Sequence, residues 1–301
     1  MTDVTFDGKV AVITGAGGGL GRSHALLLAE RGARIVVNDL GGNADGTGAG
    51  STPAELVVKE ITEAGGEAVA SYDSVATPEG GEAIIQTALD AFGTVDIVIN
   101  NAGILRDKSF AKIEPADFDI LLDVHLRGAF HVSQPAFKVM KANGFGRFVH
   151  TTSAAGLFGN FGQGNYAAAK TGLVGLSNVL AIEGAKNNIT SNVIAPIAKS
   201  RLTEDLLGPL ADGLAPELVS PLVAYLVSPA CTISHEIFSV GGGKIARVFL
   251  GLKPGWFAGK GNQYTPEDVA ANIEQIRDTT GFTIPGSLTD ETMSLISTIN
   301  G

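Results

Sequence analysis

Short runs of apolar residues, many of them β-branched, alternate along the chain with longer segments in which apolar residues recur at helical spacing. The short runs predict strands over residues 10–14, 34–38, 68–72, 95–100, 147–152, 191–194 and 237–240. The longer segments predict helices over residues 20–31, 54–64, 79–92, 115–143, 166–187 and 216–226, with 115–143 in one piece or two. Strands that are apolar throughout are typical of a parallel sheet with helices on both faces. We therefore expect an α/β fold built on a doubly wound parallel sheet of the Rossmann type.

Two segments interrupt this alternation. Residues 41–53 are rich in glycine and other small residues, which predicts a mobile surface loop after the second strand. Beyond Gly243 the regular pattern stops, and one helix is expected over residues 266–277. We therefore expect a dinucleotide-binding and catalytic domain over residues 1–243 and a C-terminal appendage over 244–301 that packs on it.

Composition and charge narrow the class of protein. The 301 residues include 21 Lys and Arg against 31 Asp and Glu, a net charge of −10, and the isoelectric point is about 4.9. Such an acidic chain is unlike a nucleic-acid-binding domain, which is usually basic. Cys231 is the single cysteine, so an intrachain disulfide and a Cys-based zinc site are excluded, and we expect no metal.

Targeting signals are not evident in the sequence. No apolar stretch approaches the roughly 20 residues that a membrane span requires. The first residues lack the basic and apolar regions of a secretory signal, and the chain does not end in Ser-Lys-Leu. We therefore expect a cytoplasmic location.

A glycine-rich segment follows the first predicted strand and opens the first predicted helix. Gly15, Gly19 and Gly21 permit a tight turn and a close approach of the backbone to a pyrophosphate, which the helix N-terminus would attract. The spacing is Gly-x-x-x-Gly-x-Gly, with Leu20 where the shorter fingerprint has its third glycine. The motif indicates a dinucleotide site; the alternative is a glycine-rich turn without a ligand.

Asp39 ends the second predicted strand, where a carboxylate can accept hydrogen bonds from ribose hydroxyls and repel a 2′-phosphate. This position favours NAD over NADP. The alternative is a surface aspartate that caps the turn before Gly41.

Ser153, Tyr166 and Lys170 form the candidate catalytic set. Ser153 follows a predicted strand, and Tyr166 and Lys170 lie four residues apart on one helix face. A tyrosine with a pKa near 10 is a weak base, but a neighbouring ammonium and an oxidised nicotinamide would stabilise its phenolate. Tyr166 could then take the proton of a hydroxyl as hydride leaves, while Ser153 holds the oxygen.

Together these motifs resemble the short-chain dehydrogenase/reductase family over nearly the whole chain. The matching pieces are residues 14–21, the Asn-Asn-Ala-Gly run at 100–103, Ser153, the Tyr166-x-x-x-Lys170 pair and the turn around Pro196. The resemblance implies that Asp73 and Ser74 flank the adenine and that the 100–103 run borders the adenosine. It also places the segment after Pro196 near the nicotinamide. The cofactor-binding residues implied by motif and resemblance are Gly15, Gly19, Leu20, Gly21, Asp39, Asp73, Ser74, Asn100, Asn101, Ala102, Gly103, Tyr166, Lys170, Pro196, Ile197, Ala198 and Ser200.

A closer resemblance is to the dehydrogenase units of D-specific peroxisomal multifunctional enzymes. It is carried by residues 37–42, 100–107, 125–128 and 159–163. Those units are (3R)-hydroxyacyl-CoA dehydrogenases, also named for 17β-hydroxysteroid activity. The resemblance implies an NAD-dependent enzyme that interconverts (3R)-3-hydroxyacyl-CoA and 3-ketoacyl-CoA in fatty-acid or sterol side-chain β-oxidation. The alternatives are a 17β-hydroxysteroid dehydrogenase and a dinucleotide-binding sensor or scaffold without catalysis.

Two residues depart from the family pattern. His125 lies where many members carry an asparagine whose backbone carbonyl holds a relay water, so its side chain is left out of the catalytic set. Lys199 follows Pro196 where relatives often have a small residue, which leaves its effect on the cofactor open.

Two further expectations concern partners. Family members usually pair through the helix that carries Tyr and Lys, so we expect a homodimer or homotetramer with Leu173, Val174, Leu176 and Leu180 as candidate contacts, burial against the sheet being the alternative. Residues 244–260 hold Lys244, Arg247, Lys253 and Lys260 and no acidic residue. This basic strip could attract the phosphates of coenzyme A, or it could be a solvated surface that only packs.

Overall fold

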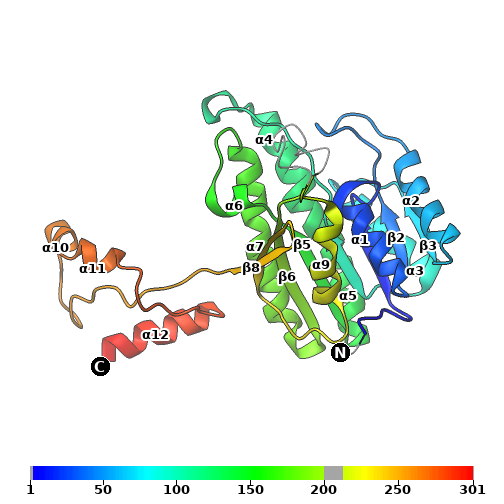
Figure 1. Ribbon diagram of the computed structural model, residues 1–301. Helices are drawn as coiled ribbons and strands as arrows, with labels where there is room; N and C mark the ends of the chain where they lie inside the picture. Colours follow the sequence, from blue (N-terminus) through cyan, green and yellow to red (C-terminus); the bar gives the residue numbers. More distant parts are fainter. Residues whose placement is uncertain (1–2, 200–212, 301) are drawn as a thin grey trace. The chain divides into compact units, whose positions relative to one another are not determined.

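A computed structural model describes residues 3–199 and 213–300. Its described residues form an eight-stranded sheet in the order β3-β2-β1-β4-β5-β6-β7-β8 (Figure 1). The strands are β1 (Val10–Thr14), β2 (Arg34–Asn38), β3 (Ala68–Ser71), β4 (Ile97–Asn100), β5 (Gly146–Thr151), β6 (Ile189–Pro196), β7 (Ile237–Gly241) and β8 (Lys244–Val248). From β3 to β7 all neighbours are parallel, which confirms the doubly wound α/β fold.

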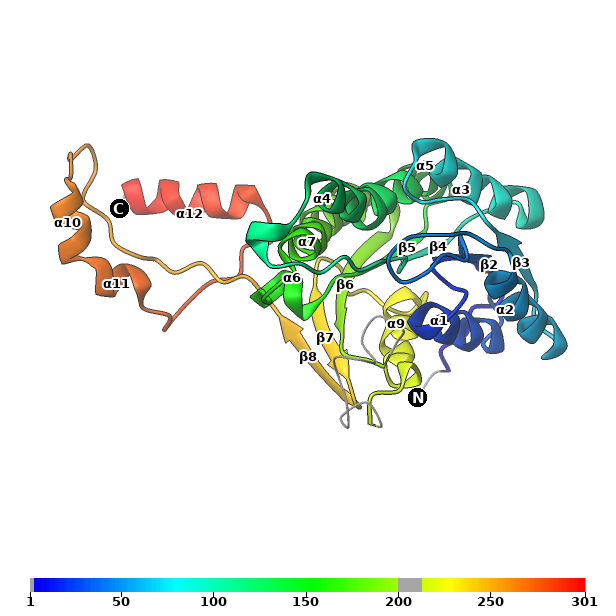
Figure 2. The ribbon, with the colours of Figure 1, turned by 90° about the horizontal axis from the view of Figure 1, so that it is seen from above.

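Helices cover both faces of this sheet (Figure 2). One face carries α1 (Gly19–Glu30), α2 (Thr52–Glu63) and α9 (Ser220–Val227), and α1 contacts both of the others. The other carries α3 (Pro78–Phe92), α4 (Pro115–Leu122), α5 (Gly128–Asn143) and α7 (Gly164–Gly184), with the short α6 (Ala154–Phe158) against α7. The helix predicted over residues 115–143 is a single run, because a π-helical turn at Asp123–Arg127 joins α4 to α5.

The alternation of side chains along each strand builds two separate apolar layers. In β1, Ala11 and Ile13 belong to the layer beneath α1, α2 and α9, while Val10 and Val12 belong to the layer beneath α3 and α5. All four are fully buried, since a parallel strand is covered on both sides. The uniformly apolar strands therefore follow from the fold.

The sheet continues one strand beyond the prediction. Gly242 and Gly243, both with positive φ (56° and 80°), form a two-residue turn that sends β8 back along β7. The residues of β8 are exposed or half-buried and two of them are basic, so no continuous apolar run marks this edge strand in the sequence.

The chain divides into two compact units, residues 1–247 and 248–301. In the second unit the helix expected over 266–277 is two short helices, α10 (Pro266–Ala271) and α11 (Ile273–Arg277), and α12 (Leu288–Asn300) was not predicted. Within this unit Phe249 stacks on Phe282 and Trp256 meets Tyr264 edge-on. Among the described residues, no helix is both long and apolar enough to cross a bilayer.

Candidate active site

A cavity of about 600 Å³ opens where β1, β2, β4, β5 and β6 end. Its lining residues come directly after these strands, for example Gly15 after β1, Asp39 after β2, Asn101 after β4 and Ser153 after β5. β1 lies between β2 and β4, so the strand order reverses beside it. In doubly wound folds this switch point is where ligands bind, because adjacent loops diverge there and leave a crevice.

The glycine loop is built for a close backbone approach. Gly15 has a φ of 63°, and a Cβ on Gly21 would lie 2.3 Å from the carbonyl oxygen of Gly15, so helix α1 packs directly on the turn. Gly18 is the N-cap residue of α1, and no side-chain cap bonds to the N–H groups of the first helical turn among the described residues. Gly18, Gly19 and Leu20 all line the cavity. The free N–H groups of the first helical turn fit a pyrophosphate. These residues therefore fit a dinucleotide.

Asp39 is buried and its carboxylate is fixed by the backbone on either side. Oδ2 accepts a hydrogen bond from Gly17 N at 2.8 Å, and Oδ1 accepts one from Gly41 N at 2.7 Å. Asp39 thus caps the turn at Gly41, as the structural alternative expected, and also lines the cavity. Each oxygen keeps acceptor capacity for a ribose hydroxyl.

The glycine-rich segment after β2 forms a wall of the cavity, which the sequence did not indicate. We call residues 40–50 the strap; Leu40, Gly42, Asn43, Ala44 and Gly46 line the cavity. The strap is fastened to the segment after β4, because Leu105 N donates to Ala44 O and Arg106 Nε donates to Asp45 O, both at 2.9 Å.

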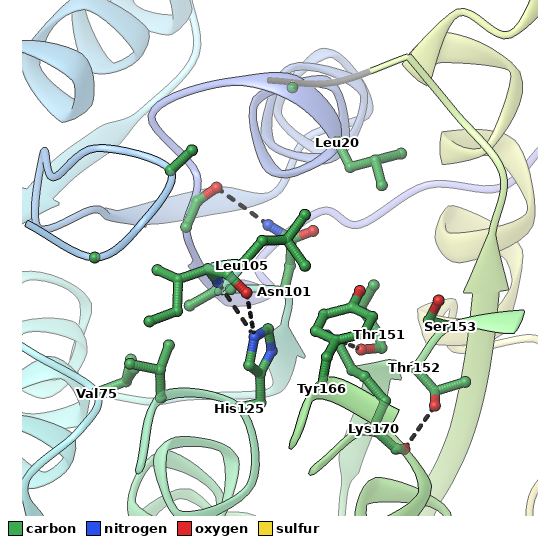
Figure 3. A pocket seen from close by; sticks show the side chains of 18 of the residues that line it. Leu20, Val75, Asn101, Leu105, His125, Thr151, Thr152, Ser153, Tyr166 and Lys170 are labelled. Atoms are coloured by element: carbon green, nitrogen blue, oxygen red, sulfur yellow. Dashed lines mark hydrogen bonds between the residues drawn. The ribbon is translucent and has the colours of Figure 1, made fainter. Parts of the chain in front are cut away.

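Ser153, Tyr166 and Lys170 meet in the cavity (Figure 3). Ser153 caps the start of α6 by accepting a hydrogen bond from Ala155 N at 3.2 Å. Lys170 is 3% exposed, its Nζ lies 5.5 Å from the centre of the Tyr166 ring, and it donates to Thr151 O at 2.6 Å. The segment after β5 thus supplies a hydroxyl, and α7 supplies a phenol and an amine beside it.

Burial dominates the electrostatics of this set. Desolvation raises the pKa of Tyr166 to about 12, although a hydrogen bond with Ser153 opposes the shift and the charge of Asp107 adds to it. Desolvation also lowers the pKa of Lys170 to about 7. In the protein alone the phenolate of Tyr166 is therefore less populated at neutral pH than that of a free tyrosine, and Lys170 changes charge near neutrality. A further positive charge in the cavity is what would favour the phenolate.

His125 lies inside the site, between the segment after β4 and Tyr166 (Figure 3). Its Nε2 is 2.8 Å from Ile104 O, and its ring meets the Tyr166 ring edge-on with centroids 5.2 Å apart. Burial, together with the charge of Lys170, holds the pKa of His125 well below 6.5, so the imidazole is neutral. The resemblance to the family marked this position but gave its side chain no role.

A polar group centred on Gln163 was missed from the sequence. Gln163 lines the cavity, donates from Nε2 to Asp107 Oδ2 at 2.7 Å and accepts from Asn160 Nδ2 at 2.9 Å. These residues belong to the runs that carry the closer resemblance, which is the signal that could have found them. They connect the loop after β4 to the start of α7.

Most of the predicted cofactor residues line the same cavity. They are Gly15, Gly19, Leu20, Asp39, Asp73, Ser74, Asn101, Ala102, Gly103, Tyr166, Lys170, Pro196, Ile197 and Ala198. Two do not: Gly21 lies under the glycine turn, and Asn100 donates to Ser133 Oγ at 2.9 Å beneath the cavity. Asn101 reaches back to the turn, donating to Thr14 O at 3.0 Å. Ser200 lies outside the described residues.

Comparison with known proteins agrees with this geometry. The sequence profile described as short chain dehydrogenase matches residues 9–204. The chain belongs to the short-chain dehydrogenase family. It is therefore an oxidoreductase, and the expected family, fold class and enzyme class are confirmed. A Mycobacterium tuberculosis protein named as a short-chain type dehydrogenase/reductase is 53% identical over 92% of this chain and 97% of its own length.

Longer relatives are similar to this chain over only a part of their own length. Mouse peroxisomal multifunctional enzyme type 2 is 50% identical over 98% of the chain, which spans 40% of that enzyme. The structure of the full-length Drosophila melanogaster enzyme of the same name superposes with a TM-score of 0.83 at 37% identity, covering 99% of this chain and 50% of that one. A short chain dehydrogenase from Mycobacterium avium superposes with a TM-score of 0.79 at 42% identity, covering 91% and 97%.

Proposed function

We propose that this short-chain dehydrogenase interconverts a (3R)-3-hydroxyacyl-CoA and its 3-ketoacyl-CoA with NAD as the hydride carrier. The observation that carries the chemistry is the meeting of Ser153, Tyr166 and Lys170 in one dinucleotide-sized cavity. The substrate class is supported by the likeness to multifunctional enzymes over 98% of the chain and by a yeast relative named hydratase-dehydrogenase-epimerase.

In the oxidation direction each residue of the set has one task. Ser153 holds the hydroxyl oxygen of the substrate, and the Tyr166 phenolate takes the hydroxyl proton. Lys170, buried under the Tyr166 ring, favours the phenolate while it is charged. Bound in this cavity, NAD would supply the hydride acceptor for the carbon that carries the hydroxyl. In the reverse direction Tyr166 returns the proton and Ser153 donates to the carbonyl oxygen.

The preference for NAD over NADP rests on Asp39. Its carboxylate is held in place by Gly17 N and Gly41 N, so it cannot easily turn away from a 2′-phosphate. A buried negative charge beside a phosphate dianion is unfavourable unless a cation intervenes. The residues that we propose to bind NAD are the predicted cofactor-binding residues that line the cavity.

Replacing Asp39 with Ala tests this preference. We expect the affinity for NAD to fall by roughly 10- to 150-fold, since charge-assisted hydrogen bonds contribute about 1.5–3 kcal/mol, and the affinity for NADP to rise relative to it. Dissociation constants measured by isothermal titration calorimetry decide this. Asp45→Ala in the strap is the matched control, because its carboxylate bonds to Thr47 instead of the glycine loop. A wild-type protein that prefers NADP would contradict the assignment.

A substrate panel tests the proposal as a whole. The (3R) and (3S) forms of a 3-hydroxyacyl-CoA, a 17β-hydroxysteroid and a simple secondary alcohol are each incubated with NAD, and NADH is followed by absorbance. We expect the highest kcat/KM for the (3R) thioester. A higher value for the steroid would replace the substrate class, and NAD binding without any turnover would indicate a sensor or scaffold.

Assembly and location complete the proposal. We place the chain in a homodimer or homotetramer formed through α7, and in the cytoplasm, although relatives are named peroxisomal. Fractionation of the source cells against marker enzymes decides the location.

A further inference from the structure

Thr152 is a buried polar residue that the proposed chemistry leaves without a task. It directly precedes Ser153, is 1% exposed and lines the cavity. We call residues 152–156 the serine segment. The Thr152 hydroxyl donates to Lys170 O on α7 at 2.6 Å (Figure 3). Because this carbonyl belongs to the helix backbone, the bond joins the serine segment to the helix that carries Tyr166 and Lys170.

Lys170 is held at both ends by two consecutive residues. Its Nζ donates to Thr151 O at 2.6 Å, while its own carbonyl accepts from the Thr152 hydroxyl. Thr151 is the last residue of β5, so a shift of α7 along the sheet would have to break both bonds. Without the Thr152 hydroxyl, the remaining bond between these residues and α7 is made by the flexible lysine side chain.

A second bond between the serine segment and α7 runs in the opposite direction. Thr171, the residue after Lys170 on α7, donates from its hydroxyl to Gly156 O. Gly156 also packs closely on the helix, because a Cβ added there would lie 2.8 Å from Lys170 Cβ. The serine segment is thus bonded to α7 on either side of Ser153, through Thr152 before it and through Gly156 after it.

We propose that Thr152 is a positioning residue of the active site, whose hydroxyl fixes the serine segment on the helix that carries Tyr166 and Lys170. Ser153 must hold the substrate oxygen within hydrogen-bond reach of the Tyr166 hydroxyl, although the two hydroxyls belong to different elements. A displacement of about 1 Å between reacting groups can cost on the order of 10²-fold in rate. This role rests on the proposed function only in that Ser153 and Tyr166 are the catalytic hydroxyls.

Two substitutions of Thr152 test the bond. Thr152→Val keeps the shape of the side chain and removes the donor, whereas Thr152→Ser keeps the donor and removes only a methyl group. We expect Thr152→Val to lower kcat roughly 10- to 100-fold with a smaller change in KM, because the misplaced groups act in the transition state. Thr152→Ser should restore most of that loss.

Ser177→Ala is the matched control for the loss of a buried hydroxyl bond on the same helix. Ser177 Oγ lies 2.8 Å from Ser191 Oγ on β6, both residues are fully buried, and Ser177 is about two helical turns beyond Lys170. Thr152→Val and Ser177→Ala should each lower the melting temperature by roughly 1–6 °C, since each removes one buried hydrogen bond. Only Thr152→Val should lower kcat.

The readouts distinguish this role from general destabilisation and from failure of the proposed function. For each variant, kcat and KM are measured on whichever secondary alcohol the wild-type protein oxidises, and NAD affinity is measured by isothermal titration calorimetry. Crystal structures of the cofactor-free wild-type protein and of Thr152→Val give the separation of Ser153 Oγ and Tyr166 Oη without any turnover. The result expected is a separation changed by about 0.5 Å or more, and a loss of kcat larger than any loss of NAD affinity.

Several results would overturn the proposal. They are a wild-type kcat in Thr152→Val, an equal loss of kcat in Ser177→Ala, a Thr152→Ser variant as impaired as Thr152→Val, and an unchanged separation of the two hydroxyls. If Thr152→Val does not fold, Thr152→Cys takes its place with the same outcomes, because a thiol is only a weak donor. A wild-type protein that oxidises no alcohol refutes the proposed function, while the two crystal structures still decide whether Thr152 sets the separation.

Discussion

Tyr166 and Lys170 show how strongly a buried setting controls individual residues of this site. Burial raises the pKa of Tyr166 to about 12 and lowers that of Lys170 to about 7, so both groups are shifted towards their neutral forms. In such a site the phenolate of Tyr166 is favoured only when the positively charged nicotinamide ring of the oxidised cofactor is bound. Binding of the oxidised cofactor and activation of the base are therefore coupled.

This coupling predicts two different titrations of one residue. In the cofactor-free protein Tyr166 should ionise near pH 12, because burial disfavours the phenolate. With oxidised NAD bound, the added positive charge should lower the pKa, so the rate of alcohol oxidation should rise with pH at a midpoint below 12. The measurement is the phenolate absorbance of wild-type protein minus that of Tyr166→Phe, with and without NAD. Equal midpoints in the two states would contradict the coupling.

The residues of the site were predictable to different degrees. Ser153, Tyr166 and Lys170 stand at fixed offsets from strand and helix ends, so their spacing carried the prediction and the cavity brings them together. His125 and Gln163 act through contacts with loops distant in sequence, and no local pattern encodes such contacts. Leu173 and Val174 were named as candidate contacts between subunits. Both are buried within the fold of the single chain, which is the alternative that the sequence left open.

At the scale of elements, the strap is the part that the pattern described least well. Its glycines indicated a loop, but both bonds that hold it against the segment after β4 end on backbone carbonyls of the strap, which every residue type carries. By contrast, the strands and most helices agree with those predicted from the apolar pattern, because a sheet that is buried on both faces needs apolar residues at those positions. β8 escaped prediction for the opposite reason, as an edge strand with exposed residues.

The strap gives a prediction about cofactor retention. Arg106 donates to Asp45 O in the strap and pairs with Asp117, while Lys108 pairs with the same Asp117 and has no bond to the strap among the described contacts. Arg106→Met should raise the dissociation constant of NAD roughly 2- to 12-fold, the worth of one hydrogen bond. Isothermal titration calorimetry measures this dissociation constant. Lys108→Met is the control, and an equal effect of both variants would count against the strap.

At the scale of the whole molecule, most basic side chains of the strip have partners that its sequence did not indicate. Arg247 pairs with Glu236 at 3.2 Å, and Lys253 pairs with Asp278 at 2.8 Å. Lys260 donates to Asn300 Oδ1 at 2.9 Å, while Lys244 is exposed. Recognition of coenzyme A phosphates by this strip stays a prediction, and it would compete with these local partners.

Assembly is the second property of the whole molecule that can be tested. Val179 and Ile182 on α7 are each 51% exposed, which is unusual for two neighbouring aliphatic residues of one helix and suits a homo-oligomer contact. The double substitution Val179→Glu and Ile182→Glu should give a monomer by light scattering, because charge is unfavourable in an apolar interface. Leu56→Glu, on α2 and 60% exposed, is the control. A wild-type protein that is already monomeric at micromolar concentration would refute the contact.

The central claim is that Tyr166 is the base of an NAD-dependent alcohol dehydrogenase. The most direct measurement is NADH formation from a (3R)-3-hydroxyacyl-CoA by the wild-type protein and by Tyr166→Phe, with NAD affinity determined for both. The account predicts rapid turnover by the wild-type protein and a loss of about 10²- to 10⁴-fold in the variant, since general-base catalysis contributes that much, at unchanged NAD affinity. A variant that keeps most of the turnover would contradict it.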